Sequence, residues 1–205
     1  VFDQVIVSTD SERIADAAYA EAEVEIIMRP AELAGATSPD IGWITHLFSQ
    51  PGLEKFRDGT FCLLRPTSPF RTAETIRRAY KQFTWSTGFD SLRAVRKVRE
   101  RIEKTWVTEA DGSMIPFEGA AHIGTTPYAN ASRPYQALEK DYGTIYVQDS
   151  SLEMAHTKVV LETGLLSGTR VMPFFSEGYE GFDVNEEEDL ILAEALVERG
   201  LVKLG

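Results

Sequence analysis

The sequence predicts one α/β domain built on a doubly wound, mostly parallel, Rossmann-like sheet. Short apolar runs rich in β-branched residues alternate with amphipathic segments about a dozen residues long. Arginine, proline and hydroxyl residues also gather where several of the predicted strands end. The 205 residues suit a single domain over residues 1–205, and we expect a β-rich arm to be inserted at residues 100–155.

The first half of the chain supplies the regular part of this pattern. Apolar runs predict strands at residues 4–8, 24–29 and 60–65, and a further strand begins near residue 89. Amphipathic stripes predict helices between them, at residues 9–22, 38–50 and 72–83. The helices begin at Asp10 or Ser11, at Pro39 and at Thr72, which are residue types that favour helix starts.

The alternation stops at residues 100–155. A hairpin with its turn at residues 110–113 is followed by a loop-rich segment with many aromatic residues. An irregular segment of this length inside a compact domain usually has a function or forms an interface. Its aromatic residues would expose a large apolar surface, which favours an interface. A strand at residues 169–175 and a helix capped by Asn185 and ended by Gly200 complete the chain.

Composition excludes several classes of function. The net charge of −11 argues against a broad nucleic-acid surface, which needs a basic field, but not against a small anionic ligand. No apolar run approaches the ~20 residues of a membrane helix. The lone Cys62 allows no internal disulfide, so we expect a reduced, cytoplasmic protein with Cys62 in its core.

Two proline-stiffened segments follow predicted strands and carry cations. In "RPTSPFR", Arg65 and Arg71 flank the hydroxyl of Ser68 on a rigid loop that suits a phosphate or carboxylate ligand. In "RPAELAGATS", Arg29 and Ser38 repeat this arrangement. The alternatives are a stiffened turn in which Arg71 pairs with surface acids, and a plain strand-to-helix loop.

A third segment, "GFDVNEEEDL", places Asp183 and Asn185 two residues apart between a strand and a helix. Alternation puts both side chains on one side of an extended backbone, and such oxygen ligands suit Mg²⁺. The alternative is a helix cap followed by acids that match the helix dipole. That alternative explains Asp183 less well, because Asp183 precedes the cap.

Together these segments resemble the acylneuraminate cytidylyltransferases. The stretches "VIVSTDSERIA", "RPAELAGATS", "LLRPTSPFRTAETI" and "GFDVNEEEDL" match that family in order and approximate spacing, and "SRPYQALEKDYGTIYV" matches its sugar-side stretch. The chain departs from the family where Arg65 replaces a frequent Gln and where Asn185 replaces a frequent Asp. We also expect the family's N-terminal nucleotide-binding loop to be missing from these residues.

The resemblance implies a reaction in which a nine-carbon 2-keto sugar acid, a nonulosonic acid, attacks the α-phosphate of CTP and releases pyrophosphate. It implies a homodimer formed through the arm, with no nucleic acid or membrane partner, and Mg²⁺ as cofactor. The site residues that it implies are Arg29, Ser38, Arg65 and Ser68 for the nucleotide, Arg133, Gln136, Lys140 and Tyr146 for the sugar, and Asp183 with Asn185 for the metal. Asp183, Arg133 and Lys140 would carry catalysis. The alternatives are a transferase for an eight-carbon ulosonic acid and an inactive nucleotide-sugar-binding protein.

Overall fold

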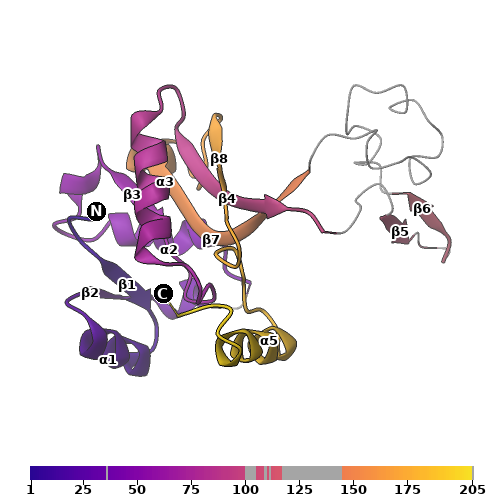
Figure 1. Ribbon diagram of the computed structural model, residues 1–205. Helices are drawn as coiled ribbons and strands as arrows, with labels where there is room; N and C mark the ends of the chain where they lie inside the picture. The colour runs from indigo at the N-terminus through magenta and orange to yellow at the C-terminus, as the bar shows by residue number, and fades with distance from the viewer. Residues whose placement is uncertain (36, 100–104, 109, 111, 117–144, 205) are drawn as a thin grey trace. The chain divides into compact units, whose positions relative to one another are not determined.

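In the computed structural model the chain divides into two compact units (Figure 1). The first unit comprises Val1–Ala94 and Asp149–Gly205, and the second comprises Val95–Gln148. The structure describes residues 1–35, 37–99, 105–108, 110, 112–116 and 145–204. Each unit is described here by itself.

The first unit contains a two-stranded sheet and most of a four-stranded sheet, of which residues 95–97 and 146–148 count toward the second unit. Strands β1 (Ile6–Thr9) and β2 (Glu25–Met28) pair in parallel, with Val7 opposite Ile26. The second sheet has the order β3-β7-β4-β8, formed by Thr60–Leu63, Tyr146–His156, Ser91–Lys97 and Val171–Phe175. Strand β7 runs antiparallel to β3, with Met154 opposite Cys62, so the expected mostly parallel sheet holds a long antiparallel strand.

The five α-helices of the described residues are α1 (Glu12–Glu21), α2 (Asp40–Phe48), α3 (Ala73–Trp85), α4 (Thr157–Thr163) and α5 (Glu187–Glu198). Helices α1 and α3 begin at the capping residues that the sequence predicts, Ser11 and Thr72, and α2 begins after Pro39 as expected. Two 3₁₀ turns, η1 (Ala31–Leu33) and η2 (Glu54–Phe56), flank α2. The Ser11 hydroxyl accepts from the Ile14 amide at 3.4 Å and that of Thr72 from the Thr75 amide at 3.2 Å, as expected for N-caps. The described helices include none that is long and apolar enough to cross a membrane.

The core of the first unit lies between α3 and the four-stranded sheet. Ala79 and Phe83 of α3 pack against Leu92 of β4, Leu152 of β7 and Phe174 of β8, all at most 3% exposed. Figure 1 shows α3 lying along this face of the sheet. Cys62 and Leu64 also pack against this core, so the end of β3, which carries the loop with Arg65, is fixed by it.

The second unit contains the predicted hairpin. Strands β5 (Trp106–Thr108) and β6 (Met114–Pro116) pair antiparallel, with Val107 opposite Ile115. Gly112 in the turn has a φ of +84°, a conformation that glycine adopts at low cost.

Several expectations need correction. Residues 149–155, assigned to the arm from the sequence, belong to β7 in the first unit, and helix α4 follows them. The N-cap of α5 is Glu186 and not Asn185. Asp189 explains the difference, because its Oδ2 accepts hydrogen bonds from the backbone amides of both residues, at 3.0 Å from Asn185 and 3.1 Å from Glu186.

Candidate functional site

Arg71 fixes the loop that follows β3. The Nη1 atom of Arg71 donates to the carbonyl of Arg65, at the start of the loop, at 3.2 Å, and also to the carbonyl of Ser151 in β7. The Ser68 amide donates to the same Arg65 carbonyl at 3.3 Å. Burial lowers the pKa of the Arg71 guanidinium. Arg71 therefore shapes the loop, and no surface acid pairs with it among the residues that the structure describes.

Arg65 is held between two carboxylates. Its Nη2 lies 2.8 Å from Asp40 Oδ2 and 2.9 Å from Glu153 Oε1. Burial acts to lower the pKa of Arg65, but the hydrogen bonds and charges of the two acids outweigh it and leave the pKa raised. Burial likewise acts to raise the pKa of Asp40, and the opposing contacts with Arg65 and Trp43 leave it lowered. The buried Glu153 also meets Arg93 of β4, at 2.7 Å.

Arg29 links the ends of β1 and β2 to α2. Its Nη2 donates to the carbonyl of Ser8 at 2.9 Å, and its Nε donates to the Ser8 hydroxyl at 3.3 Å. Its guanidinium lies 4.7 Å from the ring centroid of Trp43, a cation–π distance. Trp43 Nε1 in turn donates to Asp40 Oδ1 at 3.0 Å. Arg29, whose predicted role is nucleotide binding, is thus fixed beside the predicted loop of Arg65.

These contacts form one continuous set, called here the charge chain. It consists of Arg29, Trp43, Asp40, Arg65, Glu153 and Arg93. Its members come from the ends of two strands, the first turn of α2 and the interior strands β7 and β4. Two of the cation-bearing segments predicted from the sequence therefore do lie together.

Ser38 closes its own loop. Its hydroxyl accepts from the Gly35 amide at 3.1 Å, and its amide donates to the Gly35 carbonyl at 2.9 Å. The loop before α2 is thereby shaped by Ser38, and the predicted contact between Ser38 and a nucleotide stays a prediction.

The segment with Asp183 is hydrogen-bonded to the loop after β3. The Val184 amide donates to the Thr67 carbonyl at 2.9 Å. Asp183 Oδ2 accepts from Asn185 Nδ2 at 3.2 Å, while Asp183 Oδ1 is buried and has no hydrogen-bond partner among the described residues. The Ser68 hydroxyl, in a residue only 3% exposed, also lacks a partner in the part of the chain that the structure describes. Two buried oxygens without partners on paired loops are atoms that a bound ligand would satisfy.

Asp149 packs against Gly181 at the start of this segment and was not predicted. Its Oδ1 accepts from the Ser151 amide at 3.1 Å and hydroxyl at 2.7 Å, and its Oδ2 accepts from the Ser176 hydroxyl at 2.6 Å. Gly181 packs so closely that an added Cβ would lie 2.3 Å from Asp149 Oδ2. Ser150, which lies between Asp149 and Ser151, has a φ of +61°. The sequence signal was "DSS", because an aspartate followed by serines commonly caps its own backbone.

The residues predicted to face the sugar are placed only in part. Arg133, Gln136 and Lys140 lie outside the described residues. Tyr146 begins β7 in the second unit and is 44% exposed.

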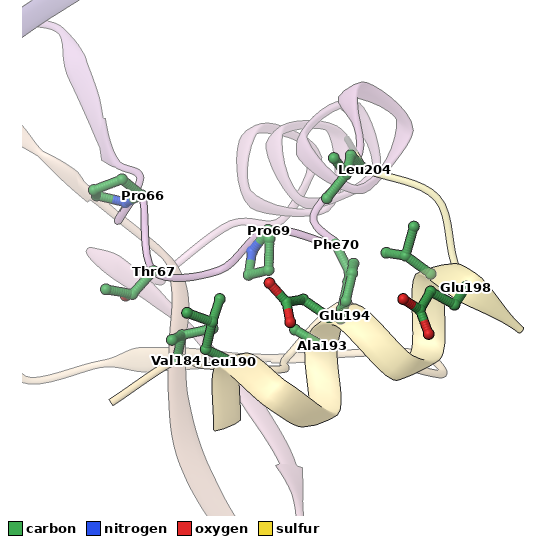
Figure 2. Close-up of a pocket in the computed structure, with 11 residues that line it drawn as sticks. Pro66, Thr67, Pro69, Phe70, Val184, Leu190, Ala193, Glu194, Glu198 and Leu204 are labelled. Carbon is green, nitrogen blue, oxygen red and sulfur yellow. The ribbon is translucent and has the colours of Figure 1, made fainter. Parts of the chain in front are cut away.

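An apolar pocket lies between α5 and the loop that follows β3 (Figure 2). Its wall includes Pro69 and Phe70 from the loop and Leu190 from α5, and its charged residues are Glu194 and Glu198. An apolar wall with two acids does not suit an anionic nucleotide. The pocket is therefore not assigned to the predicted nucleotide site.

No family model matches the chain. A CMP-N,N'-diacetyllegionaminic acid synthase of Legionella pneumophila subsp. pneumophila (strain Philadelphia 1) is 28% identical over 202 residues, which cover 96% of this chain and 78% of that protein. The chain is a distant homologue of this synthase. The likeness agrees with the resemblance seen in the sequence motifs.

Two solved structures share the fold. A 4-diphosphocytidyl-2C-methyl-D-erythritol synthase from Anaerococcus prevotii has a TM-score of 0.60 and 13% identity, over 97% of this chain and 83% of its own. A CMP:2-keto-3-deoxy-manno-octonic acid synthetase, solved with CTP, has a TM-score of 0.56 and 12% identity, over 96% of this chain and 81% of its own. The fold is therefore the α/β fold of cytidylyltransferase structures.

Proposed function

We propose that the protein is a cytidylyltransferase that joins CMP from CTP to the anomeric hydroxyl of a sugar acid. The observation that carries the proposal is the similarity to a CMP-N,N'-diacetyllegionaminic acid synthase over 96% of the chain. The proposed substrate is a sialic acid or a related nine-carbon 2-keto sugar acid. This finer choice rests on the motif resemblance together with that relative.

The proposed reaction is a displacement at phosphorus. The anomeric oxygen of the sugar acid forms a bond to the α-phosphorus of CTP, and the bond from that phosphorus to the bridging oxygen breaks. Pyrophosphate leaves, and the hydroxyl proton passes to a base or to water. Positioning and charge neutralisation dominate such chemistry, so rigidly held side chains are what the protein needs to provide.

The described residues support these roles by being fixed. Arg29 is held by Ser8 and Trp43, and the loop with Ser68 is held by Arg71. On the proposal, Arg29 and Ser38 line the nucleotide, and the partnerless hydroxyl of Ser68 donates to a phosphate or sugar oxygen. Arg133, Gln136 and Lys140 complete the sugar side in this proposal.

A magnesium ion fits the segment with Asp183. The buried Asp183 Oδ1 lacks a partner among the residues that the structure describes, and Asn185 lies within hydrogen-bond distance of the other oxygen. Within the described part of the chain, no group of three His, Cys, Asp or Glu side chains could hold a metal. Mg²⁺ often takes only one or two carboxylates together with substrate phosphates, so one aspartate is compatible. When bound, the ion would neutralise phosphate charge.

The test is product formation by the full-length protein. CTP and Mg²⁺ are incubated with N-acetylneuraminic acid, N,N'-diacetyllegionaminic acid or the eight-carbon 2-keto-3-deoxy-manno-octonic acid. We expect a CMP-sugar and an equal amount of pyrophosphate with a nine-carbon acid. Turnover of the eight-carbon acid alone would reassign the substrate, and CTP binding without any product would favour an inactive binding protein.

We also propose a homodimer formed through the arm, which after the correction of its end covers residues 100–148. The support is the aromatic content of that segment and the motif resemblance. Sedimentation at micromolar concentration should give twice the chain mass. A fully active monomer would contradict this proposal.

A further inference from the structure

The charge chain places Arg65 in an unusual position for a residue that would bind triphosphate. Two carboxylates, Asp40 and Glu153, lie within 2.9 Å of one nitrogen of its guanidinium. The Glu153 side chain is 5% exposed, whereas Arg65 is 26% and Asp40 32% exposed. The buried Glu153 therefore offsets the charge of Arg65 from the protein interior, while part of the Arg65 side chain is accessible to a ligand from solvent.

Only one of the three nitrogens of the Arg65 guanidinium donates hydrogen bonds to described residues. Nη2 makes both contacts, and no described residue accepts a hydrogen bond from Nε or Nη1. A guanidinium has five N–H bonds in a rigid plane, so fixing Nη2 also fixes the directions of the other three. The backbone of Arg65 is fixed as well, because its carbonyl accepts from Arg71 and Ser68.

We propose that Asp40 and Glu153 hold Arg65 to bind the carboxylate of the sugar acid, and not the triphosphate of CTP. This inference rests on the proposed function. Arg65 would be the binding residue, and Asp40 and Glu153 would be positioning residues that act through it.

The charges explain the preference for a carboxylate. Repulsion from Asp40 and Glu153 grows in proportion to the charge of the incoming group. A carboxylate carries one negative charge, whereas the triphosphate of CTP carries three or four. With Arg93, which also pairs with Glu153, the four charged groups sum to zero, so no net charge draws a triphosphate to Arg65. Binding there depends on a charge-assisted hydrogen bond from Nε or Nη1, which a single carboxylate can accept.

The acids have a second use on the sugar side. Carboxylate oxygens accept hydrogen bonds from hydroxyl and amide N–H groups. A sugar acid offers these donors close to its carboxylate, whereas in CTP they belong to the ribose and the cytosine and not to the phosphates. Arg29 differs from Arg65 in this respect, because its described contacts are with Ser8 and the ring of Trp43 and with no carboxylate. The two arginines are therefore assigned to different substrates, Arg29 to CTP and Arg65 to the sugar acid.

The experiment compares binding of both substrates to the full-length protein by calorimetric titration, together with kcat and KM. The probes are CTP, N,N'-diacetyllegionaminic acid and the carboxamide of that acid. R65Q should weaken binding of the acid at least 10-fold and change CTP binding less than 2-fold. R65K should recover part of the loss, and D40N should raise KM for the acid with a smaller change in kcat.

The carboxamide identifies the group that Arg65 contacts. The unaltered protein should bind the carboxamide at least 10-fold more weakly than the acid, and R65Q should bind the two within about 3-fold of each other. R77Q is the control, because within the described residues Arg77 pairs with Glu74 alone, on an exposed helix face. A thermal melt of each variant excludes unfolding as the cause.

Each outcome bears on a different claim. Weaker CTP binding by R65Q with unchanged binding of the acid would assign Arg65 to the phosphates and overturn the inference. Unchanged binding of both would leave Arg65 as a brace and also overturn it. Failure of the unaltered protein to bind any sugar acid would overturn the proposed function as well.

Discussion

Replacing Glu153 by glutamine should destabilise the protein by an amount that the charge chain determines. The side chain is 5% exposed and its two oxygens meet Arg65 at 2.9 Å and Arg93 at 2.7 Å. Removing one partner of a buried ion pair costs ~3–5 kcal/mol, because the other charge stays buried. Both arginines are about one quarter exposed and Arg65 keeps Asp40, so we expect about 2–3 kcal/mol.

The assay is equilibrium unfolding of the full-length protein in urea, followed by circular dichroism, with a thermal melt beside it. For a protein of this size 1 kcal/mol corresponds to roughly 2–4 °C, so the melting temperature should fall by roughly 4–12 °C. The matched control is E74Q, which breaks the pair of Glu74 with Arg77 at 3.5 Å, where the side chains are 77% and 60% exposed. The control should cost less than ~0.5 kcal/mol.

A double-mutant cycle with R93Q isolates the pair that E153Q breaks. If Glu153 and Arg93 interact as their distance indicates, the two substitutions together should cost clearly less than the sum of their separate costs. An E153Q variant as stable as E74Q, with additive behaviour in the cycle, would refute the reasoning. Glu153 would then be a residue that water screens despite its burial.

Four further predictions follow from the same residues. D183N should lower turnover by orders of magnitude while the melting temperature stays within ~2 °C, because Asp183 Oδ1 has no partner to lose among the described residues; near-normal turnover would contradict the metal assignment. R29A should weaken CTP binding by ~1.5–3 kcal/mol in calorimetry, the range of a charge-assisted hydrogen bond. Asp40 has a lowered folded-state pKa, so its contribution is complete above about pH 4 and is lost as the pH falls through that pKa; urea titrations should show a flatter acid limb for D40N than for the unaltered protein. G181A should cost ~1–3 kcal/mol in the same titrations, because its Cβ would displace the Asp149 carboxylate, and an unchanged midpoint would contradict that packing.

The sequence predicted the elements whose pattern is local. The helix that starts at Thr72 has a cap, an amphipathic stripe and 13 residues, and each of these is visible in a short window. The hairpin with Gly112 in its turn was equally clear. Strand β7 was missed because six of the residues from Asp149 to Ala155 are buried, among them Asp149, Ser151 and Glu153, so no alternation of polar and apolar residues marks it.

The site was predicted as a set of cations and not as a set of ion pairs. Proline stiffening and the ends of strands singled out Arg29 and Arg65, which the structure links through Trp43 and Asp40. Their acids could not be assigned from the sequence, because Asp40 lies 25 residues from Arg65 and Glu153 lies 88 residues away. Contacts at such separations depend on the register of β3 with β7, which no local pattern shows.

The paired arginines also explain how a protein with a net charge of −11 can prepare a site for anions. A guanidinium without partners near the core would lose solvation, and its long side chain would adopt many rotamers. Asp40 and Glu153 remove both costs for Arg65 before any ligand arrives, at the expense of part of its attraction for an anion. Arg71 shows the other solution, since backbone carbonyls hold it in place and it shapes the loop that carries Ser68. The two acids weaken the long-range attraction of Arg65 for an anion but fix its geometry. A transferase that must align two substrates at one phosphorus depends more on that fixed geometry.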